Sequence, residues 1–318
     1  MKKNVVLIRL DKIGDLICSL PVDQVIDTNE YNVTWIVQKG MGQVVDLGTR
    51  KRKYYELDKN DPKSSARQLA KILKEINPDV AISFQAPWWV NFELFKARIP
   101  VRSGVRSQWH SFVFLNQGLR QKRSQATQHE LQYNLDLVLQ TLSLKPTREF
   151  LFFEIAKPAE LNILEKYSLQ PESYIVVHPG MMGSALNWKQ SQYIDYIHQQ
   201  LLRQKKIVIT GTPSDEPYLT EIKSKYANHP QVLILQSKLN MKELIQVLAH
   251  AEFVVAPSTG VAHLAASVGA RVLAIFSPIR VHHPRRWAPR GPRVEIFLPK
   301  EDLANDPNCM DTIHLPLL

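Results

Sequence analysis

The stretch that decides the fold is NVVLIRLDKIGD, residues 4–15. Its apolar beginning predicts a buried strand, and Asp11–Gly14 predicts the turn that follows. A helix is expected from Leu16 to about Thr28, with a kink or a start near Ser19 because Pro21 lies inside it. A strand that leads through a glycine turn into a helix is typical of an α/β sheet.

The same order recurs along the whole chain. Further strands are expected at Val33–Gln38, Tyr54–Leu57, Asp79–Phe84, Tyr174–His178, Lys206–Thr210, Val232–Gln236, Phe253–Ala256 and Val272–Phe276. Further helices are expected at Ser64–Asn77, Glu130–Leu142, Gln190–Arg203, Glu216–Tyr226, Met241–His250 and Gly260–Gly269. An aromatic loop is expected around Trp88 and Trp89. Short apolar strands that alternate with helices predict parallel sheets flanked by helices.

The chain divides near its middle. At about 150 residues per domain, a chain of 318 residues predicts two domains. A composition break with two prolines at Leu144–Pro158 puts the boundary there, which gives domains of residues 1–155 and 156–318. Because both halves alternate strands with helices, we expect two Rossmann-like domains whose parallel sheets face each other across a cleft.

Composition excludes several classes of protein. The two cysteines, Cys18 and Cys309, are too few for a disulfide scaffold or a cysteine-based zinc cluster. No uncharged apolar run approaches the roughly 18 residues of a membrane-spanning helix. The apolar run Val5–Ile8 is also too short for the core of a signal peptide. We therefore expect a cytoplasmic protein.

The charge balance favours an anionic partner. Lys and Arg number 40 against 30 Asp and Glu, which gives a formal charge of +10. No acidic residue occurs in Leu94–His129 or in Phe253–Val294. Either window alone is equally well explained as a solvated face. Two such windows, each long enough to include buried elements, make an anion-binding cleft the better interpretation.

The loops at the carboxyl ends of the strands are the candidate sites, since ligands bind there in open parallel sheets. After the first strand, Gly14 permits close approach of a ligand, and Asp15 is presented beside it. A helix-capping role explains Asp15 equally well. In the glycine-containing loop His178–Ser184, backbone N–H groups are able to face an anion. We interpret His178 itself as a hydrogen-bonded strand-end histidine rather than a catalytic one.

Two later loops that also follow strands are further candidate sites. Ser258-Thr259-Gly260 leads into a small-residue helix whose first N–H groups suit a phosphate or diphosphate, although a plain Ser/Thr cap also explains the hydroxyls. Glu216 is either a ribose-binding acceptor or an acidic residue of a first helical turn. The dinucleotide-binding and P-loop glycine motifs do not occur, and His282-His283 fits a surface loop better than a metal site.

In this order the segments resemble the heptosyltransferase family, glycosyltransferase family 9, from Val5 to about Pro289. The most specific matches are Arg9–Asp15 followed by Leu20-Pro21, and Ser258-Thr259-Gly260 followed by His263-Leu264-Ala265-Ala266. Supporting matches are His129-Glu130, His178-Pro179-Gly180, Gly183–Trp188 and Phe276-Ser277-Pro278.

The resemblance implies a GT-B fold and inverting transfer of a heptose from ADP-heptose to the lipopolysaccharide inner core. It implies Asp15 as the general base, and neither a metal nor a cofactor is expected. The expected donor-binding residues, which include two arginines from the second acid-free window, are Gly183, Ser184, Thr212, Glu216, Ser258, Thr259, Gly260, His263, Arg285 and Arg286. The expected acceptor-binding residues come from the first loop and from the basic stretch Lys96–Arg123, and they are Lys12, Gly14, Arg102, Arg106 and Arg120.

The sequence also departs from the family pattern. Many members carry an aspartate at the position of Ser258 and a lysine at that of Leu186, while Lys189 replaces a proline. A glycosyltransferase that uses another nucleotide sugar or acceptor is therefore the main alternative. The basic stretch suits an anionic glycolipid acceptor, with peripheral contact at the cytoplasmic face of the inner membrane. A non-catalytic nucleic-acid-binding protein is a second alternative, but no helix-turn-helix, RNP or zinc pattern supports it.

Overall fold

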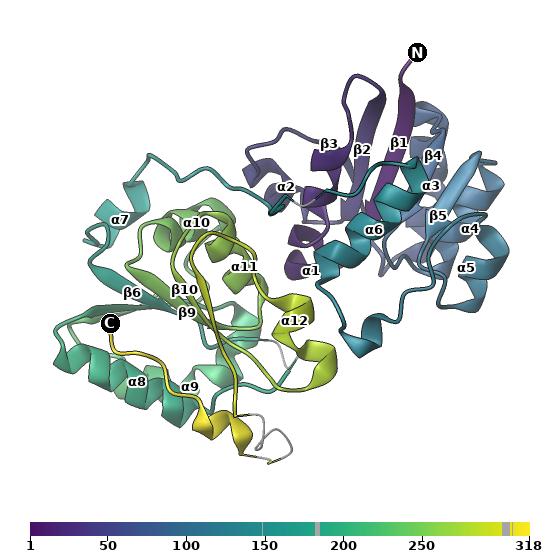
Figure 1. Cartoon of the computed structure of the whole chain (residues 1–318). Helices are drawn as coiled ribbons and strands as arrows, with labels where there is room; N and C mark the ends of the chain where they lie inside the picture. The colour runs from purple at the N-terminus through teal and green to yellow at the C-terminus, as the bar shows by residue number, and fades with distance from the viewer. Residues whose placement is uncertain (148, 182–184, 301–305, 307) are drawn as a thin grey trace. The chain divides into compact units, whose positions relative to one another are not determined.

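The chain forms two compact units, Met1–Phe153 and Glu154–Leu318. The structure is a computed structural model that describes residues 1–318 except 148, 182–184, 301–305 and 307 (Figure 1). Each unit is built on a single sheet in which every pair of neighbouring strands is parallel. Among the described residues, no helix combines the length and the apolar character needed to cross a bilayer.

The sheet of the first unit has the first strand at its centre. Its strand order is β3-β2-β1-β4-β5 (Figure 1). The strands are β1 Lys3–Arg9, β2 Tyr31–Gln38, β3 Lys53–Leu57, β4 Val80–Ser83 and β5 Val101–Gly104. β1 is buried from Val5 onward on both faces, which explains its unbroken apolar sequence. Because the strands all run the same way, the loops after β1, β3, β4 and β5 lie along one edge of the sheet.

The helices of this unit are α1 Ile13–Ile17, η1 Leu20–Val25, α2 Gly42–Leu47, α3 Pro62–Ile76, α4 Trp88–Lys96, α5 Trp109–Phe114, η2 Arg123–Gln125 and α6 Glu130–Leu142. Some of them, such as α3 and α6, begin at a residue whose side chain caps them, whereas α1, η1, α2 and α4 have no side-chain cap. In α3, Asp61 accepts a hydrogen bond from the backbone N–H of Ser64, and Pro62 lies in the first turn. Asn77 ends the helix in the left-handed conformation.

The expected helix from Leu16 to Thr28 is wrong as a single helix. The chain instead forms the short helix α1, a break at Cys18–Ser19, and the 3₁₀ helix η1. Pro21 lies in the first turn of η1, where its missing N–H leaves no hydrogen bond unmade. The start near Ser19 that the proline predicts is therefore close to the observed start of η1.

The expected aromatic loop around Trp88 and Trp89 is also wrong, because these residues begin helix α4. The basic stretch that follows contains a strand, β5, and a further helix, α5, that the sequence did not predict. In α4, buried residues such as Val90 and Leu94 alternate with exposed aromatic residues such as Trp88 and Phe95. Apolar side chains therefore surround the helix, which removes the periodic signal on which helix prediction rests.

The second unit has a larger sheet of the same kind. Its strand order is β11-β10-β9-β6-β7-β8. The strands are β6 Tyr174–Val177, β7 Lys206–Ile209, β8 Val232–Ile234, β9 Phe253–Pro257, β10 Val272–Ile275 and β11 Val294–Phe297. The first five lie where the apolar runs predict them, with small differences at their ends, and β11 was not predicted.

Helices cover the sheet of the second unit. They are α7 Asn162–Lys166, α8 Gln190–Leu202, η3 Pro213–Tyr218, α9 Thr220–Tyr226, α10 Met241–Ala249, α11 Gly260–Ser267, η4 Arg280–His282, α12 Pro284–Trp287 and η6 Cys309–Thr312. The expected helix Glu216–Tyr226 is two helices: the 3₁₀ helix η3, which contains Pro217, and α9, with the break between them at Leu219. The short helices α7 and α12 were not predicted.

Candidate functional site

The first strand ends in a buried arginine that gathers three carboxylates. Arg9 is only 1% exposed. Its Nη2 lies 2.5 Å from Oδ1 of Asp15, its Nε 2.9 Å from Oδ2 of Asp11, and its Nη1 3.2 Å from Oε1 of Glu130. A guanidinium is always protonated, so at this depth it requires carboxylate partners. These four residues are called the Arg9 cluster below.

Glu130 fixes the far side of the Arg9 cluster. It is the first residue of α6 and is fully buried. Its Oε1 also accepts a hydrogen bond from Nη1 of Arg123, at 2.5 Å. Sequence reasoning noted the pair His129-Glu130 only as a family match and gave neither Arg9 nor Glu130 a role. The sequence did contain one signal for this ion pair. Arg9 lies inside an apolar strand, and a buried arginine needs a buried acid as its partner.

Asp15 does not cap a helix. α1 begins at Ile13, so Asp15 is its third residue, and the helix has no side-chain cap at its N-terminus. The Asp15 carboxylate binds Arg9 instead and remains 27% exposed. Burial raises the pKa of Asp15 above its ordinary value; repulsion from Asp11 and Glu130 adds to this, and attraction to Arg9 opposes it. The result is a partly accessible carboxylate that is a stronger base than an exposed aspartate.

The residues expected to bind the acceptor lie in two kinds of environment. Lys12 is exposed, and Gly14 lies partly exposed within α1. Arg102 donates to the backbone carbonyls of Phe114 and Ile99, at 2.9 and 2.5 Å, and Arg106 donates to that of Leu115, at 3.3 Å. Those two guanidinium groups therefore hold the chain around α5. Arg120 is exposed.

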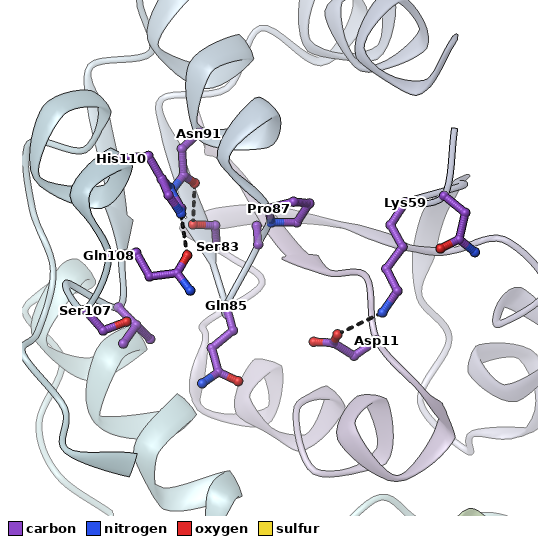
Figure 2. Close-up of a pocket in the computed structure, with 12 residues that line it drawn as sticks. Asp11, Lys59, Ser83, Gln85, Pro87, Asn91, Ser107, Gln108 and His110 are labelled. Atoms are coloured by element: carbon purple, nitrogen blue, oxygen red, sulfur yellow. Dashed lines mark hydrogen bonds and ion pairs between the residues drawn. The ribbon is translucent and has the colours of Figure 1, made fainter. Parts of the chain in front are cut away.

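A cavity of about 490 Å³ opens at the carboxyl edge of the first sheet (Figure 2). Residues from the loops after β1, β3, β4 and β5 line it, and most of these residues are polar. Besides Asp11 and Lys59, the polar residues of the lining are Asn60, Ser83, Gln85, Asn91, Ser107, Gln108 and His110. Asp11 of the Arg9 cluster lines the same cavity, whereas none of the five expected acceptor residues does. Sequence reasoning did not find this cavity.

The turn from β9 into α11 has the form expected of an anion site. Thr259 is the N-cap residue by backbone conformation, yet its side chain makes no capping hydrogen bond. Its Oγ1 is buried and has no partner among the described residues. The alternative of a plain hydroxyl cap is therefore wrong for Thr259. Ser258 and Gly260 beside it are partly exposed, and His263 lies buried one turn into the helix.

The loop after β6 is only partly described. Gly183 and Ser184 lie outside the described residues, so the expectation that they bind the donor stays a prediction. His178 is buried and its Nδ1 lies 3.1 Å from Oγ1 of Thr210. Burial lowers the pKa of His178 to about 4, although Asp215 opposes the shift. The ring is therefore neutral and hydrogen-bonded, as expected for a structural histidine.

Thr212 and Glu216 both have partners within the protein. Thr212 is the N-cap of η3, and its Oγ1 donates to Oδ2 of Asp215 at 2.7 Å. Glu216 lies in the first turn of η3 and pairs with Nζ of Lys223 at 2.8 Å. Hydrogen bonds from Lys223 and Gln236 lower the pKa of Glu216. The acidic first-turn interpretation describes Glu216 correctly, and a ribose would have to share its carboxylate with these two donors.

The two arginines expected at the donor site differ. Both belong to the short helix α12, where Arg285 is exposed and Arg286 is buried. The guanidinium of Arg286 lies 4.6 Å from the centre of the Trp287 ring. Nζ of Lys189 lies 2.7 Å from Oδ2 of Asp311. Leu186, where many family members have lysine, is 40% exposed.

No group of three or more His, Cys, Asp and Glu side chains that could hold a metal ion occurs in the part of the chain that the structure describes. His283 accepts a hydrogen bond from the backbone N–H of Arg285 and so caps α12. The two neighbouring histidines thus belong to helical turns, η4 and α12, and not to the plain loop that the sequence suggested.

Two all-parallel sheets in one chain, each flanked by helices, are the architecture of the GT-B fold class. The chain belongs to glycosyltransferase family 9, the heptosyltransferase family, whose model matches residues 66–311. It is 24% identical over 299 residues to a Haemophilus influenzae protein named provisionally as a glycosyltransferase, covering 90% of this chain and 86% of that one. The match to the family model begins after the loop that carries Asp15.

Solved structures of the family have the same fold. A family 9 glycosyltransferase from Veillonella parvula superposes with a TM-score of 0.80 at 17% identity, covering 98% of this chain and 90% of that one. The ADP-heptose lipopolysaccharide heptosyltransferase II of E. coli gives 0.74 at 16% identity, with 93% and 90% covered. E. coli heptosyltransferase WaaC with ADP gives 0.72 at 17% identity, with 96% of each chain covered.

Proposed function

We propose that this glycosyltransferase moves a heptose from ADP-heptose to the lipopolysaccharide inner core, with inversion and without a metal ion. The observation that carries the proposal is the Asp15 carboxylate, which Arg9 holds at the end of the first strand with a raised pKa. The relatives supply the chemistry: one solved structure is an ADP-heptose lipopolysaccharide heptosyltransferase, and another contains ADP-2-deoxy-2-fluoro heptose.

Asp15 is the general base in this mechanism. As the acceptor hydroxyl oxygen bonds to the anomeric carbon of the donor, its proton passes to Asp15, and the bond from that carbon to the diphosphate breaks. The electron pair of the broken bond leaves with the diphosphate. Attack from the face opposite the leaving group inverts the anomeric carbon. The ion pair with Arg9 fixes the carboxylate in one orientation, and the raised pKa strengthens it as a base.

The second domain, residues 156–318, holds the donor in this proposal. The N-terminus of α11 offers backbone N–H groups and the unpartnered hydroxyl of Thr259 to the departing diphosphate. The exposed Arg285 adds a positive charge. The other proposed donor contacts are Gly183, Ser184, Thr212, Glu216, Ser258, Gly260, His263 and Arg286. The first domain, residues 1–155, holds the acceptor, with outer contacts from Lys12, Gly14, Arg102, Arg106 and Arg120.

The acceptor is anchored in a membrane, and one surface of the first unit suits contact with it. Its large apolar side chains on α4 and α5 are 46–66% exposed, and we call them the aromatic surface: Trp88, Phe95, Trp109, Phe112 and Val113. Phe114 joins its members, since its ring centre lies 5.7 Å from that of Phe95 and 6.1 Å from that of Trp109. The exposed Arg98 follows α4, and no acidic residue occurs in Leu94–His129. Exposed aromatic residues beside cations fit the surface of an anionic bilayer.

The test is transfer in vitro. The purified chain, treated with EDTA, is incubated with ADP-heptose and with lipopolysaccharide that ends at the inner core. We expect an acceptor heavier by one heptose in mass spectra, with an inverted anomeric centre by NMR. Transfer that requires added metal, or that retains the anomeric configuration, would contradict the mechanism. The absence of transfer from ADP-heptose, with transfer from another nucleotide sugar, would contradict the assigned donor alone.

A nucleotide sugar other than ADP-heptose is the competing candidate for the donor, and specific residues favour it. Ser258 and Leu186 stand where many family members have aspartate and lysine, and Lys189 is paired with Asp311. These differences remove charged groups from the donor side. A panel of nucleotides measured by thermal shift separates the two candidates, because a ligand that binds the folded state raises its melting temperature. ADP should give a larger rise than UDP or GDP if the donor is ADP-heptose.

A further inference from the structure

The cavity at the edge of the first sheet contains charged groups, but they are paired with one another. Nζ of Lys59 lies 3.2 Å from Oδ1 of Asp11, and Oδ2 of the same carboxylate lies 2.9 Å from Nε of Arg9. Lys59 is the only lysine or arginine among the described residues that line the cavity. An anionic ligand there would therefore compete with Asp11 for the positive charge of Lys59.

A chain of neutral hydrogen bonds forms one wall of the cavity (Figure 2). The hydroxyl of Ser83 donates to Oδ1 of Asn91 at 3.0 Å, and Nδ2 of Asn91 donates to Nδ1 of His110 at 2.9 Å. Nε2 of His110 then donates to Oε1 of Gln108 at 2.6 Å. Burial lowers the pKa of His110, so its ring is neutral and suits both roles. Every group in this wall is uncharged and held in one orientation.

The free hydrogen-bonding groups of the cavity are also neutral. Among the described residues, the side chains of Asn60, Gln85 and Ser107 have no hydrogen-bond partner, and the amide N–H groups of Gln108 have none either. Gln85 has a positive φ of 57°, which is uncommon for a residue with a side chain. Strained backbone of this kind is often kept where a side chain has a task. Figure 2 shows Gln85 between Gln108 and Asp11.

We propose that this cavity binds a neutral, polyhydroxylated sugar of the acceptor, the sugar whose hydroxyl is glycosylated. The proposal rests on the proposed function. Fixed neutral amides and hydroxyls match the donors and acceptors of sugar hydroxyls, and Ala86, Pro87 and Val105 give the ring an apolar wall. A phosphate or carboxylate on that sugar would find no unpaired cation, so anionic groups of the glycolipid lie outside the cavity, near the exposed Lys12 and Arg120.

The cavity is also connected to the candidate base. Asp11 lines the cavity and binds Arg9, and Arg9 binds Asp15. A sugar hydroxyl at the Asp11 end of the cavity is thus presented toward the Arg9 cluster. The arrangement assigns the recognition of the sugar to neutral groups and its deprotonation to the Arg9 cluster.

The experiment compares two synthetic acceptors that differ only in the terminal sugar, one with a neutral heptose and one with the same heptose carrying one phosphate. We expect the neutral acceptor to have at least tenfold higher kcat/KM. Gln85→Ala and Gln108→Ala should each raise the KM for the neutral acceptor by about 3- to 10-fold, the usual worth of a neutral hydrogen bond, while the KM for the donor stays unchanged.

The chain offers a matched control for Gln85→Ala. Gln204 is an exposed glutamine that also has a positive φ, 61°, but it follows α8 in the second unit. Gln204→Ala therefore makes the same substitution in the same kind of backbone conformation away from the cavity. It should leave both KM values unchanged. A converse variant, Gln85→Lys, places an unpaired cation at the cavity and should reduce the preference for the neutral acceptor.

The outcomes separate this inference from the proposed function. Binding of a neutral heptoside alone is measured by ligand-observed NMR without any donor, and Gln85→Ala should weaken it. Binding without any transfer would contradict the proposed function and support the cavity. Efficient transfer with equal or greater preference for the phosphorylated acceptor, or with unchanged KM in both glutamine variants, would overturn the inference and leave the function standing.

Discussion

The two units present opposite kinds of chemistry, each at the carboxyl end of a central strand of its sheet. At the end of β1 in the first unit, the buried guanidinium of Arg9 is paired with three carboxylates, of which those of Asp11 and Asp15 are partly accessible. At the end of β9 in the second unit, the turn into α11 carries no side-chain charge and leaves the hydroxyl of Thr259 without a partner among the described residues. The charged groups of the first site are paired within the protein, whereas the second site has hydrogen-bond donors to offer an anion.

This difference matches the needs of glycosyl transfer. A base must be charged and correctly oriented before the substrate arrives, so its environment is built from the chain itself. A leaving diphosphate brings its own charge, so its site needs donors that stay open until the ligand binds. The comparison predicts that changes at the first site alter turnover or folding, while changes at the second alter donor affinity.

The largest expected effect on turnover is that of Asp15→Asn. The amide keeps the size of the side chain and one contact with Arg9 but cannot accept a proton, so turnover should fall by about 10²–10⁴-fold at unchanged donor affinity. Because the folded-state pKa is raised, ionised Asp15 favours unfolding as pH rises through that pKa, so the neutral variant should melt at or near the wild-type temperature at neutral pH.

A carboxylate elsewhere in the same unit is the control. Asp136 on α6 accepts hydrogen bonds from Gln128 and Gln132 and lies outside the Arg9 cluster. Asp136→Asn should leave turnover close to that of the wild type. Similar turnover in the two variants would show that the loss is not specific to Asp15.

The largest expected effect on stability is that of Arg9→Met. Removing the cation leaves the buried Glu130 with one partner fewer and Asp15 and Asp11 with no opposing charge from Arg9, which should lower the free energy of unfolding by about 3–5 kcal/mol in urea titrations. Arg271→Met breaks the exposed pair with Glu295 and should cost less than about 1 kcal/mol. Equal losses would mean that the Arg9 cluster is not a buried charge network.

Arg285→Ala tests the other side of the comparison. The exposed guanidinium should bind the donor diphosphate, and the loss of a charge-assisted hydrogen bond should weaken ADP binding by about 10- to 100-fold in calorimetry. Arg67→Ala, which removes an exposed arginine from α3, should leave ADP affinity unchanged. Unchanged affinity in Arg285→Ala would leave that arginine as surface charge. Arg286→Ala is a poorer test, because it also removes the packing on Trp287, so that a loss of stability would not be separated from a loss of ADP binding.

The smallest effect is expected at the membrane surface. Arg98→Ala beside the aromatic surface should weaken binding to vesicles rich in anionic lipid by roughly fivefold, which corresponds to about 1 kcal/mol. Arg203, an exposed arginine that follows α8, provides the matched substitution. Co-sedimentation with anionic and zwitterionic vesicles measures both variants. If Arg98→Ala and Arg203→Ala reduce vesicle binding equally, the binding depends on net charge and not on the aromatic surface.

The sequence predicted most of the parallel strands, because these strands are largely apolar runs with polar ends; β5 and β11, which contain charged residues, were missed. The helix predictions failed at α4, which has apolar side chains on most sides, and around Pro21 and Pro217, where the chain forms separate short helices. Single site residues such as Asp15 and Thr259 were found from loops that follow strands. Their partners were not, because Arg9 and Glu130 are separated by 121 residues and only the fold brings them together. The cavity comes from four such loops and has no local motif.

The pH dependence of kcat/KM tests the central claim, that Asp15 is the general base, most directly. The base acts only when it is deprotonated, so kcat/KM of the wild type should fall as pH falls through the pKa of Asp15. Because burial raises that pKa, the fall should begin at a higher pH than for an exposed aspartate. In Asp15→Asn the residual activity should lose this acidic limb. An acidic limb that persists unchanged in Asp15→Asn would mean that another group accepts the proton and that Asp15 is not the base.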